Sequence, residues 1–156
     1  MNPRNIAEMR GGSRAGHPVY NSKGVGRHLI VDLYGCDPHI LSDEKPLIRI
    51  LTEAANHSGA TIVGRYAEKF DKGGGVSAIV VIKESHISLH TWPELGYASL
   101  DIFTCGDSVD PWKAYEYIIR KIRPFKVGAF EVIRGQNVLI DLSLSLHTEA
   151  EEQRGG

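Results

Sequence analysis

The amino-acid sequence predicts an α+β fold in which two helices pack on one face of an antiparallel β-sheet. Segments with the alternation or apolar content of strands and segments with helical periodicity follow one another in the order strand, helix, strand, strand, strand, helix, strand. Packing both helices on one side of a sheet is the economical arrangement for this order. With 156 residues, 42% of them apolar, the chain is long enough for one packed core and too short for two.

The predicted strands are short runs in which apolar side chains alternate with polar ones or stand together. The run 76–82 is almost entirely apolar, which indicates a strand buried on both faces, and the glycines at 73–75 predict a turn before it. Residues 138–146 also alternate and are a candidate for a further strand. The strands that we predict are 26–34, 60–70, 76–82, 97–105 and 126–133.

Two segments carry helix signals. The first begins at Ser42 or Asp43, both good N-caps, and Gly59 is a fitting stop. The second begins after Asp110 as N-cap, with Pro111 at its first position. The apolar stripes predicted to face the core are Leu47, Ile50, Leu51, Ala54, Ala55 and Ser58 in the first helix, and Trp112, Tyr115, Ile119 and Ile122 in the second.

The composition of the chain ends, the net charge and the cysteine count indicate the domain limits and the classes of partner to expect. Residues 1–24 and 147–156 are polar and aperiodic, so we expect a flexible arm and a polar tail around a single domain over 25–146. The net charge of −1 gives no reason to expect nucleic acid or a membrane as partner, and a cytoplasmic location is expected. Cys36 and Cys105 are too few for a disulfide framework and are expected to be free thiols, Cys36 as a small buried or loop residue.

The segment 84–94 concentrates reactive side chains beyond what a core strand requires. Ser85 follows the carboxylate Glu84, His86 and His90 come next, and Cys105 closes a nearby strand. Serine, histidine and cysteine can supply a nucleophile, a base near neutral pH and an acid. This density predicts a catalytic site.

The two histidines also have simpler interpretations. In a segment rich in β-branched residues, His86 or His90 taken alone is a typical hydrogen-bonded strand histidine. A His-x-x-x-His pair also suggests zinc, but that geometry requires a helix. In the extended segment expected here, the two side chains lie about 13 Å apart, too far to share one ion.

Several motifs are spread along the chain from about Gly26 to Gly135. They are KESHISLHTWPE at 83–94, GYA at 96–98 and DIFTCG at 101–106, together with GRHL at 26–29, SGATIV at 58–63 and DPWKA at 110–114. Together they closely resemble the prokaryotic S-adenosylmethionine decarboxylase proenzymes, a pyruvoyl-dependent family. In that family the chain cuts its own Glu-Ser bond, and the serine becomes an N-terminal pyruvoyl group.

The resemblance implies how this chain would be processed and what it would do. Cleavage between Glu84 and Ser85 would give a β chain of residues 1–84 and an α chain whose pyruvoyl terminus is the only cofactor. The substrate would be S-adenosylmethionine, and its decarboxylated form would serve spermidine and other polyamine synthesis. Two processed protomers would associate into a larger sandwich, with active sites shared with or near the interface.

The resemblance also assigns roles to individual residues. His90 would be the base of self-cleavage, with His86 as a second candidate, and the Ser77 hydroxyl would assist. Cys105 would donate the proton that completes decarboxylation. Glu94 would bind ribose hydroxyls. Phe70 would stack on adenine. The glycine turn after Phe70 is one residue longer than in the family, so the match of Phe70 to the family's phenylalanine stays open.

Two other functions compete with this one. A pyruvoyl-dependent arginine decarboxylase uses the same scaffold, although Pro93 and Gly96 favour the adenosylmethionine enzymes. The other is a non-catalytic α+β module that holds a metal through His86, His90 and Cys105. An intact-mass measurement separates this module from both enzymes, because only the enzymes cut their own chain.

Overall fold

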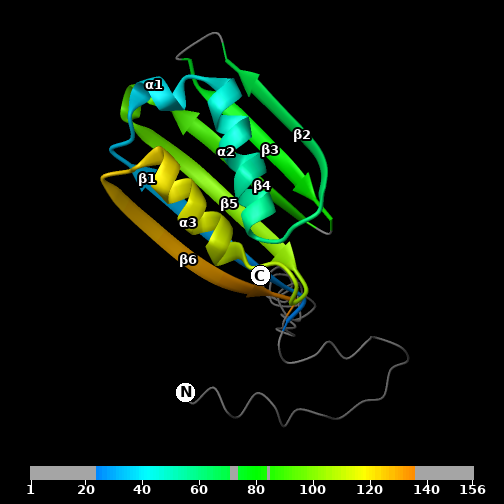
Figure 1. Ribbon diagram of the computed structural model, residues 1–156. Coiled ribbons are helices and arrows are strands. Elements are labelled where there is room, and N and C mark those ends of the chain that lie inside the picture. The colour runs from blue at the N-terminus through cyan, green and yellow to red at the C-terminus, as the bar shows by residue number, and fades with distance from the viewer. Residues whose placement is uncertain (1–23, 71–73, 84, 136–156) are drawn as a thin grey trace, which may run out of the picture.

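The computed structural model describes residues 24–70, 74–83 and 85–135, which form one antiparallel sheet covered by helices on one face (Figure 1). The sheet has six strands in the order β2-β3-β4-β5-β1-β6. The α+β prediction is therefore confirmed. In chain order the elements are β1 (Gly26–Tyr34), α1 (Pro38–Leu41), α2 (Glu44–His57), β2 (Ile62–Lys69), β3 (Val76–Ile82), β4 (Ser85–Trp92), the 3-10 turn η2 (Pro93–Leu95), β5 (Tyr97–Cys105), α3 (Pro111–Ile122) and β6 (Lys126–Arg134).

The first strand of the chain lies inside the sheet. β1 pairs along its full length with β5 on one side and with β6 on the other, both antiparallel. The neighbours β2, β3 and β4 form two successive antiparallel hairpins, and β4 continues into β5. The first strand of the chain therefore lies between two strands from the second half of the sequence.

The two long helices begin and end where the sequence indicates. The Asp43 carboxylate accepts a hydrogen bond from the backbone N–H of Lys45 at the start of α2, and Asp110 accepts one from Trp112 at the start of α3. After α2 the chain turns at Gly59, whose φ of +85° favours glycine. These caps fix the length of each helix before tertiary packing is considered.

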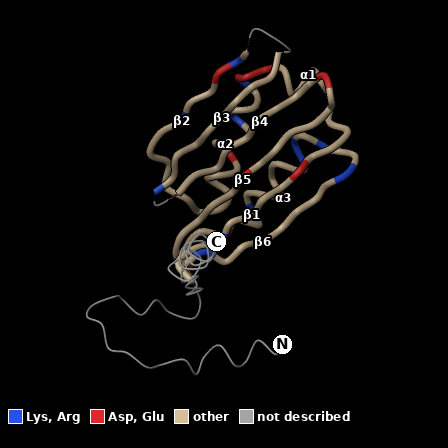
Figure 2. The backbone as a smooth tube through the Cα atoms, turned by 180° about the vertical axis from the view of Figure 1, so that it is seen from behind, with Lys and Arg blue, Asp and Glu red and all other residues tan. Residues whose placement is uncertain are grey.

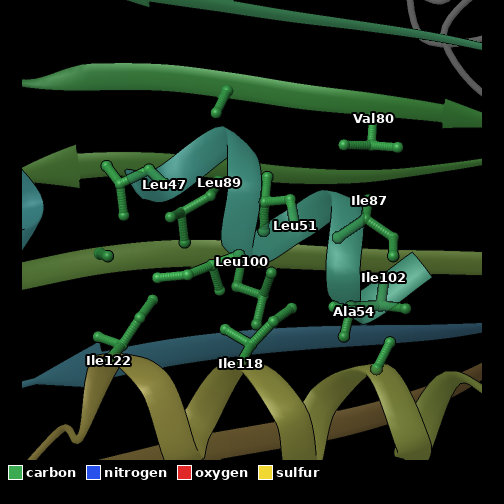
Figure 3. Packing of buried hydrophobic residues seen from close by; sticks show 14 of the residues in the cluster. Leu47, Leu51, Ala54, Val80, Ile87, Leu89, Leu100, Ile102, Ile118 and Ile122 are labelled. Carbon is green, nitrogen blue, oxygen red and sulfur yellow. The ribbon is translucent and has the colours of Figure 1, made fainter. Parts of the chain in front are cut away.

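The core lies between the helices and the inner face of the sheet (Figure 3). Side chains from α2 and α3 meet alternate residues of the central strands, and all of them are almost fully buried. Every residue of the predicted α2 stripe is buried. The labelled members of the cluster in Figure 3 are Leu47, Leu51, Ala54, Val80, Ile87, Leu89, Leu100, Ile102, Ile118 and Ile122.

Three details differ from the sequence prediction. The strand β3 is not buried on both faces: Val80 is inaccessible, but Val81 is 41% exposed on the other side. The predicted stripe of α3 was partly wrong: Ile122 is buried as expected, but Trp112, Tyr115 and Ile119 are only partly buried. The other buried side chains of this helix include Ala114, Tyr117 and Ile118. The short α1 and the strand β4 were not counted among the predicted elements.

The second face of the sheet, here called the open face, carries no helix in the described part of the chain. Figure 2 views the molecule from the side opposite to that of Figure 1. On the four central strands, Asp32 and Asp101 are the carboxylates of this face, and Ile30 and Val81 are exposed apolar residues on it. The edge strand β6 adds the exposed Phe130. An uncovered sheet face with exposed apolar side chains is typical of an interface.

Some predictions lie beyond the described residues. The arm at 1–24, apart from Gly24, the tail at 147–156 and the candidate strand at 138–146 fall there. None of the helices among residues 24–135 is both long and apolar enough to cross a bilayer.

Candidate active site

The predicted cleavage site lies at a tight hairpin. Ile82 at the end of β3 pairs with Ser85 at the start of β4, so that only residues 83 and 84 connect the two strands. Lys83 donates its backbone N–H to the carbonyl of Thr61 at 2.7 Å, which ties this turn to the chain before β2. A two-residue loop is the shortest common hairpin connection. Ser85 therefore begins β4 directly after the chain has reversed direction.

The Ser85 hydroxyl points to the helix side of the sheet. Its strand partner Ile82 is 2% exposed and belongs to the core, and residues paired in an antiparallel ladder share a face. The Ser85 Oγ is buried and has no hydrogen-bond partner among the described residues. A buried hydroxyl without a partner is uncommon and marks this residue as a candidate for chemistry.

Cys105 ends β5 on the open face, close to the hairpin. The ladder pairs it with Gly26, and a Cβ atom on Gly26 would come within 3.2 Å of the Cys105 sulfur and 2.7 Å of the Phe103 ring. Gly26 therefore leaves room for the thiol. The thiol is half-buried, and the strand alternation directs it away from the side that holds the Ser85 hydroxyl.

A network of ring and charged groups lies beside Cys105 on the same face. The carboxylate of Asp101 lies 2.9 Å from His28 Nε2, and the Arg134 guanidinium lies 3.2 Å from His28 Nδ1. Since a guanidinium can only donate, His28 Nδ1 accepts and His28 Nε2 donates to Asp101. The ring centroids of His28 and Phe103 are 5.4 Å apart, and those of His86 and Phe103 are 6.1 Å apart. Sequence reasoning gave no role to His28, although it belongs to the GRHL motif at 26–29.

A second cluster lies at the other end of the open face. The Ser77 hydroxyl is 2.7 Å from His90 Nδ1, because the ladder pairs these two residues directly. They line a pocket of about 230 Å³ together with Phe70, Trp92 and Glu94. The structure thus brings together four of the predicted site residues, Phe70, Ser77, His90 and Glu94.

Trp92 lies at the end of β4, two residues after His90. It is 39% exposed and lines the pocket, with its ring 5.3 Å from that of Tyr97. The Tyr97 hydroxyl donates to Asp32 at 2.6 Å, and this hydrogen bond is the main cause that raises the pKa of Tyr97 to about 12. An aromatic wall therefore extends from the pocket toward β1.

The two clusters are far apart within one chain. His90 follows Ser85 by five residues on the same strand, which corresponds to about 16 Å at the rise of a β-strand. Cys105 lies six residues along β5 from Ser99, the partner of His90, or about 20 Å. One chain therefore does not bring His90 to Ser85 or to Cys105.

The metal alternative finds no support in this geometry. His86 and His90 lie on one continuous strand, about 13 Å apart along it. The described residues contain no group of three side chains that could hold a metal ion.

Burial raises the pKa of the Cys36 thiol, as expected for a small buried cysteine.

The comparisons with known proteins agree with this arrangement. A family model described as S-adenosylmethionine decarboxylase matches residues 27–135. The S-adenosylmethionine decarboxylase proenzyme of Pyrobaculum islandicum is 48% identical over 106 residues, which are 68% of this chain and 85% of that protein. The proenzyme of Clostridium tetani is 47% identical over 111 residues, 71% of this chain and 87% of that protein.

Solved structures give the same result. The crystal structure of the adenosylmethionine decarboxylase from Aquifex aeolicus superposes with a TM-score of 0.67 at 32% sequence identity, covering 76% of this chain and 97% of that one. The resemblance found in the motifs is therefore confirmed over most of the chain. The chain belongs to the S-adenosylmethionine decarboxylase family.

Proposed function

We propose that this chain is a self-processing S-adenosylmethionine decarboxylase whose pyruvoyl group arises from Ser85, and that its product serves polyamine synthesis. Family membership supports the activity. The observation that carries the assignment of Ser85 is its place at the two-residue hairpin, where its buried hydroxyl has no partner among the described residues. Such a hydroxyl is free to react with the backbone carbonyl that precedes it.

Self-cleavage follows from the chemistry of a serine next to its own peptide bond. The Ser85 oxygen attacks the carbonyl carbon of Glu84, and the amide becomes an ester as the C–N bond breaks and the hydroxyl proton passes to the Ser85 nitrogen. Removal of the Cα proton of Ser85 then expels the Glu84 carboxylate by β-elimination. Addition of water and loss of ammonia leave the pyruvoyl terminus of the α chain. The base that removes the proton must lie within hydrogen-bond reach, about 3 Å.

The two chains formed by this cut would remain interleaved. The β chain would hold β1, β2 and β3, and the α chain would hold β4, β5 and β6. Because β1 lies between β5 and β6, and β3 pairs with β4, separating the chains requires breaking three ladders. The cut at the hairpin removes none of these ladders. The processed protein is therefore one folded unit of two chains.

The distance between the clusters supports an active site shared by two copies. Ser85 and Cys105 lie at one end of the sheet, and the Ser77–His90 pair lies at the other. If two copies packed by their open faces around a two-fold axis through the middle of that face, the end with Ser85 and Cys105 of one copy would meet the end with Ser77 and His90 of its partner. Exposed apolar residues on this face, such as Ile30 and Val81, favour such contact. Each dimer would then hold two complete sites.

In this shared site each residue has a defined task. His90, oriented by its hydrogen bond to Ser77, would remove the Cα proton of the partner copy's serine at position 85. His86 remains the second candidate because it adjoins the cleavage site. Cys105 would protonate the substrate carbon after carbon dioxide has left.

The pocket beside His90 fits an adenosyl sulfonium. Phe70 and Trp92 offer aromatic faces for the adenine ring and the cation, and Glu94 offers a carboxylate for ribose hydroxyls. A pyruvoyl group supplies the ketone that condenses with the substrate amine and takes up the electrons freed by decarboxylation. Assays with S-adenosylmethionine and with arginine separate the leading function from arginine decarboxylation, because only the first substrate carries an adenosyl group.

Intact mass is the direct test of the proposal. The purified chain should give two fragments, residues 1–84 and 85–156, the second lacking an amine at its terminus. The Ser85→Ala variant, which keeps the backbone and loses only the hydroxyl, should remain one chain. Recovery of the unmodified chain as a single uncut polypeptide, or fragments that persist in Ser85→Ala, would refute self-processing at this bond.

A further inference from the structure

Thr104 shares an unusual property with the proposed nucleophile. Its side chain is 1% exposed, and its hydroxyl, like that of Ser85, is buried without a hydrogen-bond partner among the described residues. Strand hydroxyls that are buried normally donate to a nearby carbonyl, as Thr91 does to Leu41 at 2.8 Å. The lone hydroxyl of Thr104 therefore needs an explanation other than packing.

The sheet register places the two hydroxyls opposite each other. The ladder between β4 and β5 ends with the pair His86 and Phe103. Continued by one position, the same register sets Ser85 opposite Thr104. Paired residues of antiparallel strands have Cβ atoms about 5 Å apart on one face of the sheet. Both side chains point to the helix side, whereas Cys105 points to the open face.

The surroundings of Thr104 would suit an apolar side chain better. The preceding residues of β5 on the same face, Leu100 and Ile102, are fully buried core residues. Valine has the shape of threonine without a hydroxyl to desolvate, so valine would pack at this position without the unpaired polar group. A hydroxyl kept here at a cost in stability points to a role in a different state of the hairpin.

We propose that Thr104 is a positioning residue for self-cleavage, with its hydroxyl accepting a hydrogen bond from the Ser85 O–H. This inference rests on the proposed self-processing at Ser85. The hydrogen bond forms when the Ser85 side chain rotates toward the Glu84 carbonyl, and it holds a lone pair of the serine oxygen toward the carbonyl carbon. Thr104 moves no proton itself. It acts on the first step, formation of the ester.

The residues of the open face are badly placed for this task. Ser77, His90 and Cys105 all lie on the side of the sheet away from the Ser85 hydroxyl. They can act on groups that reach that face. While Ser85 keeps its strand conformation, Thr104 is the polar side chain paired with it on the helix side.

The test compares Thr104→Val, which keeps the shape and loses the hydroxyl, with Thr104→Ser, which keeps the hydroxyl. Each chain is made in a cell-free system, and the cut fraction is followed by intact mass. We expect Thr104→Val to slow cleavage by about tenfold or more and Thr104→Ser to cut at a rate near that of the unmodified chain. Hydroxylamine, which cleaves esters, should not speed cleavage of Thr104→Val, because the missing step precedes the ester.

Stability is measured separately so that a folding defect is not mistaken for a positioning effect. With Ser85→Ala present to prevent cutting, Thr104→Val should melt at the same temperature or higher. Four results would each overturn the inference. Two concern cleavage rates: Thr104→Val is cut as fast as the unmodified chain, or Thr104→Val and Thr104→Ser are slowed equally. The other two are rapid cutting of Thr104→Val by hydroxylamine and a lowered melting temperature of Thr104→Val. If the unmodified chain is not cut at all, self-processing itself fails and this inference falls with it.

Discussion

A shared active site predicts that two inactive variants restore each other. His90→Ala keeps Ser85 and Cys105 but lacks the base, and Ser85→Ala keeps the Ser77–His90 pair but cannot be cut. Five strand residues separate Ser85 from His90, about 16 Å, while a base must come within about 3 Å. Neither variant should therefore process alone. A mixed dimer combines one intact end from each copy into one complete site.

The expected yield follows from symmetry. If both variants are co-expressed in equal amounts and pair at random, about half of the His90→Ala chains face a Ser85→Ala copy and should be cut. Intact mass identifies the cut chain, because residue 90 lies in the 85–156 fragment and the fragment carries alanine there. The cut dimers should also decarboxylate S-adenosylmethionine.

A matched control removes the base from both copies. Co-expression of His90→Ala with the double variant Ser85→Ala, His90→Ala gives dimers that differ from the test only in lacking His90. These dimers should yield no alanine-bearing fragment. Absence of that fragment in the test pair, with mixed dimers verified by native mass, would refute the shared site, and so would full cleavage of His90→Ala alone.

Three further outcomes are expected. After cleavage, fragments 1–84 and 85–156 should co-elute in native gel filtration and separate only in denaturant, since β1 lies between strands of the other chain; separation without denaturant would contradict the interleaved sheet. Leu100→Ala, at a fully buried core position, should lower the free energy of unfolding by about 2–5 kcal/mol, measured by urea titration in the uncut Ser85→Ala background; a loss below about 1 kcal/mol would contradict the packing. The pKa of Tyr97 is raised to about 12 from its ordinary 10.0, so its contribution to stability is complete below pH 10 and is lost as the pH rises through 12; urea titrations at increasing pH should show this loss, and Tyr97→Phe should lack it.

Local sequence signals were sufficient for most of the fold. Alternation defined β1 and β5 to the residue, and the apolar run 76–82 did the same for β3. The caps Asp43 and Asp110 located the starts of both long helices. Those signals act within a few residues of the chain, so they can be read without knowing the fold. The stripe of α3 failed because aromatic residues occur on both of its faces, and only packing against α2 and the sheet selects one.

The motif around Ser85 identified the family and the reactive residue types, and it did so from the sequence alone. Which of those residues meet depends on the pairing of strands that are distant in sequence, and no local periodicity encodes that register. Pairing of β3 with β4 joins Ser77 to His90, while pairing of β4 with β5 sets His86 opposite Phe103 and so brings Thr104 toward Ser85. The tertiary structure therefore decided that the predicted site residues occupy two ends of the sheet, because a strand holds residues five positions apart at a fixed distance that no side chain can span.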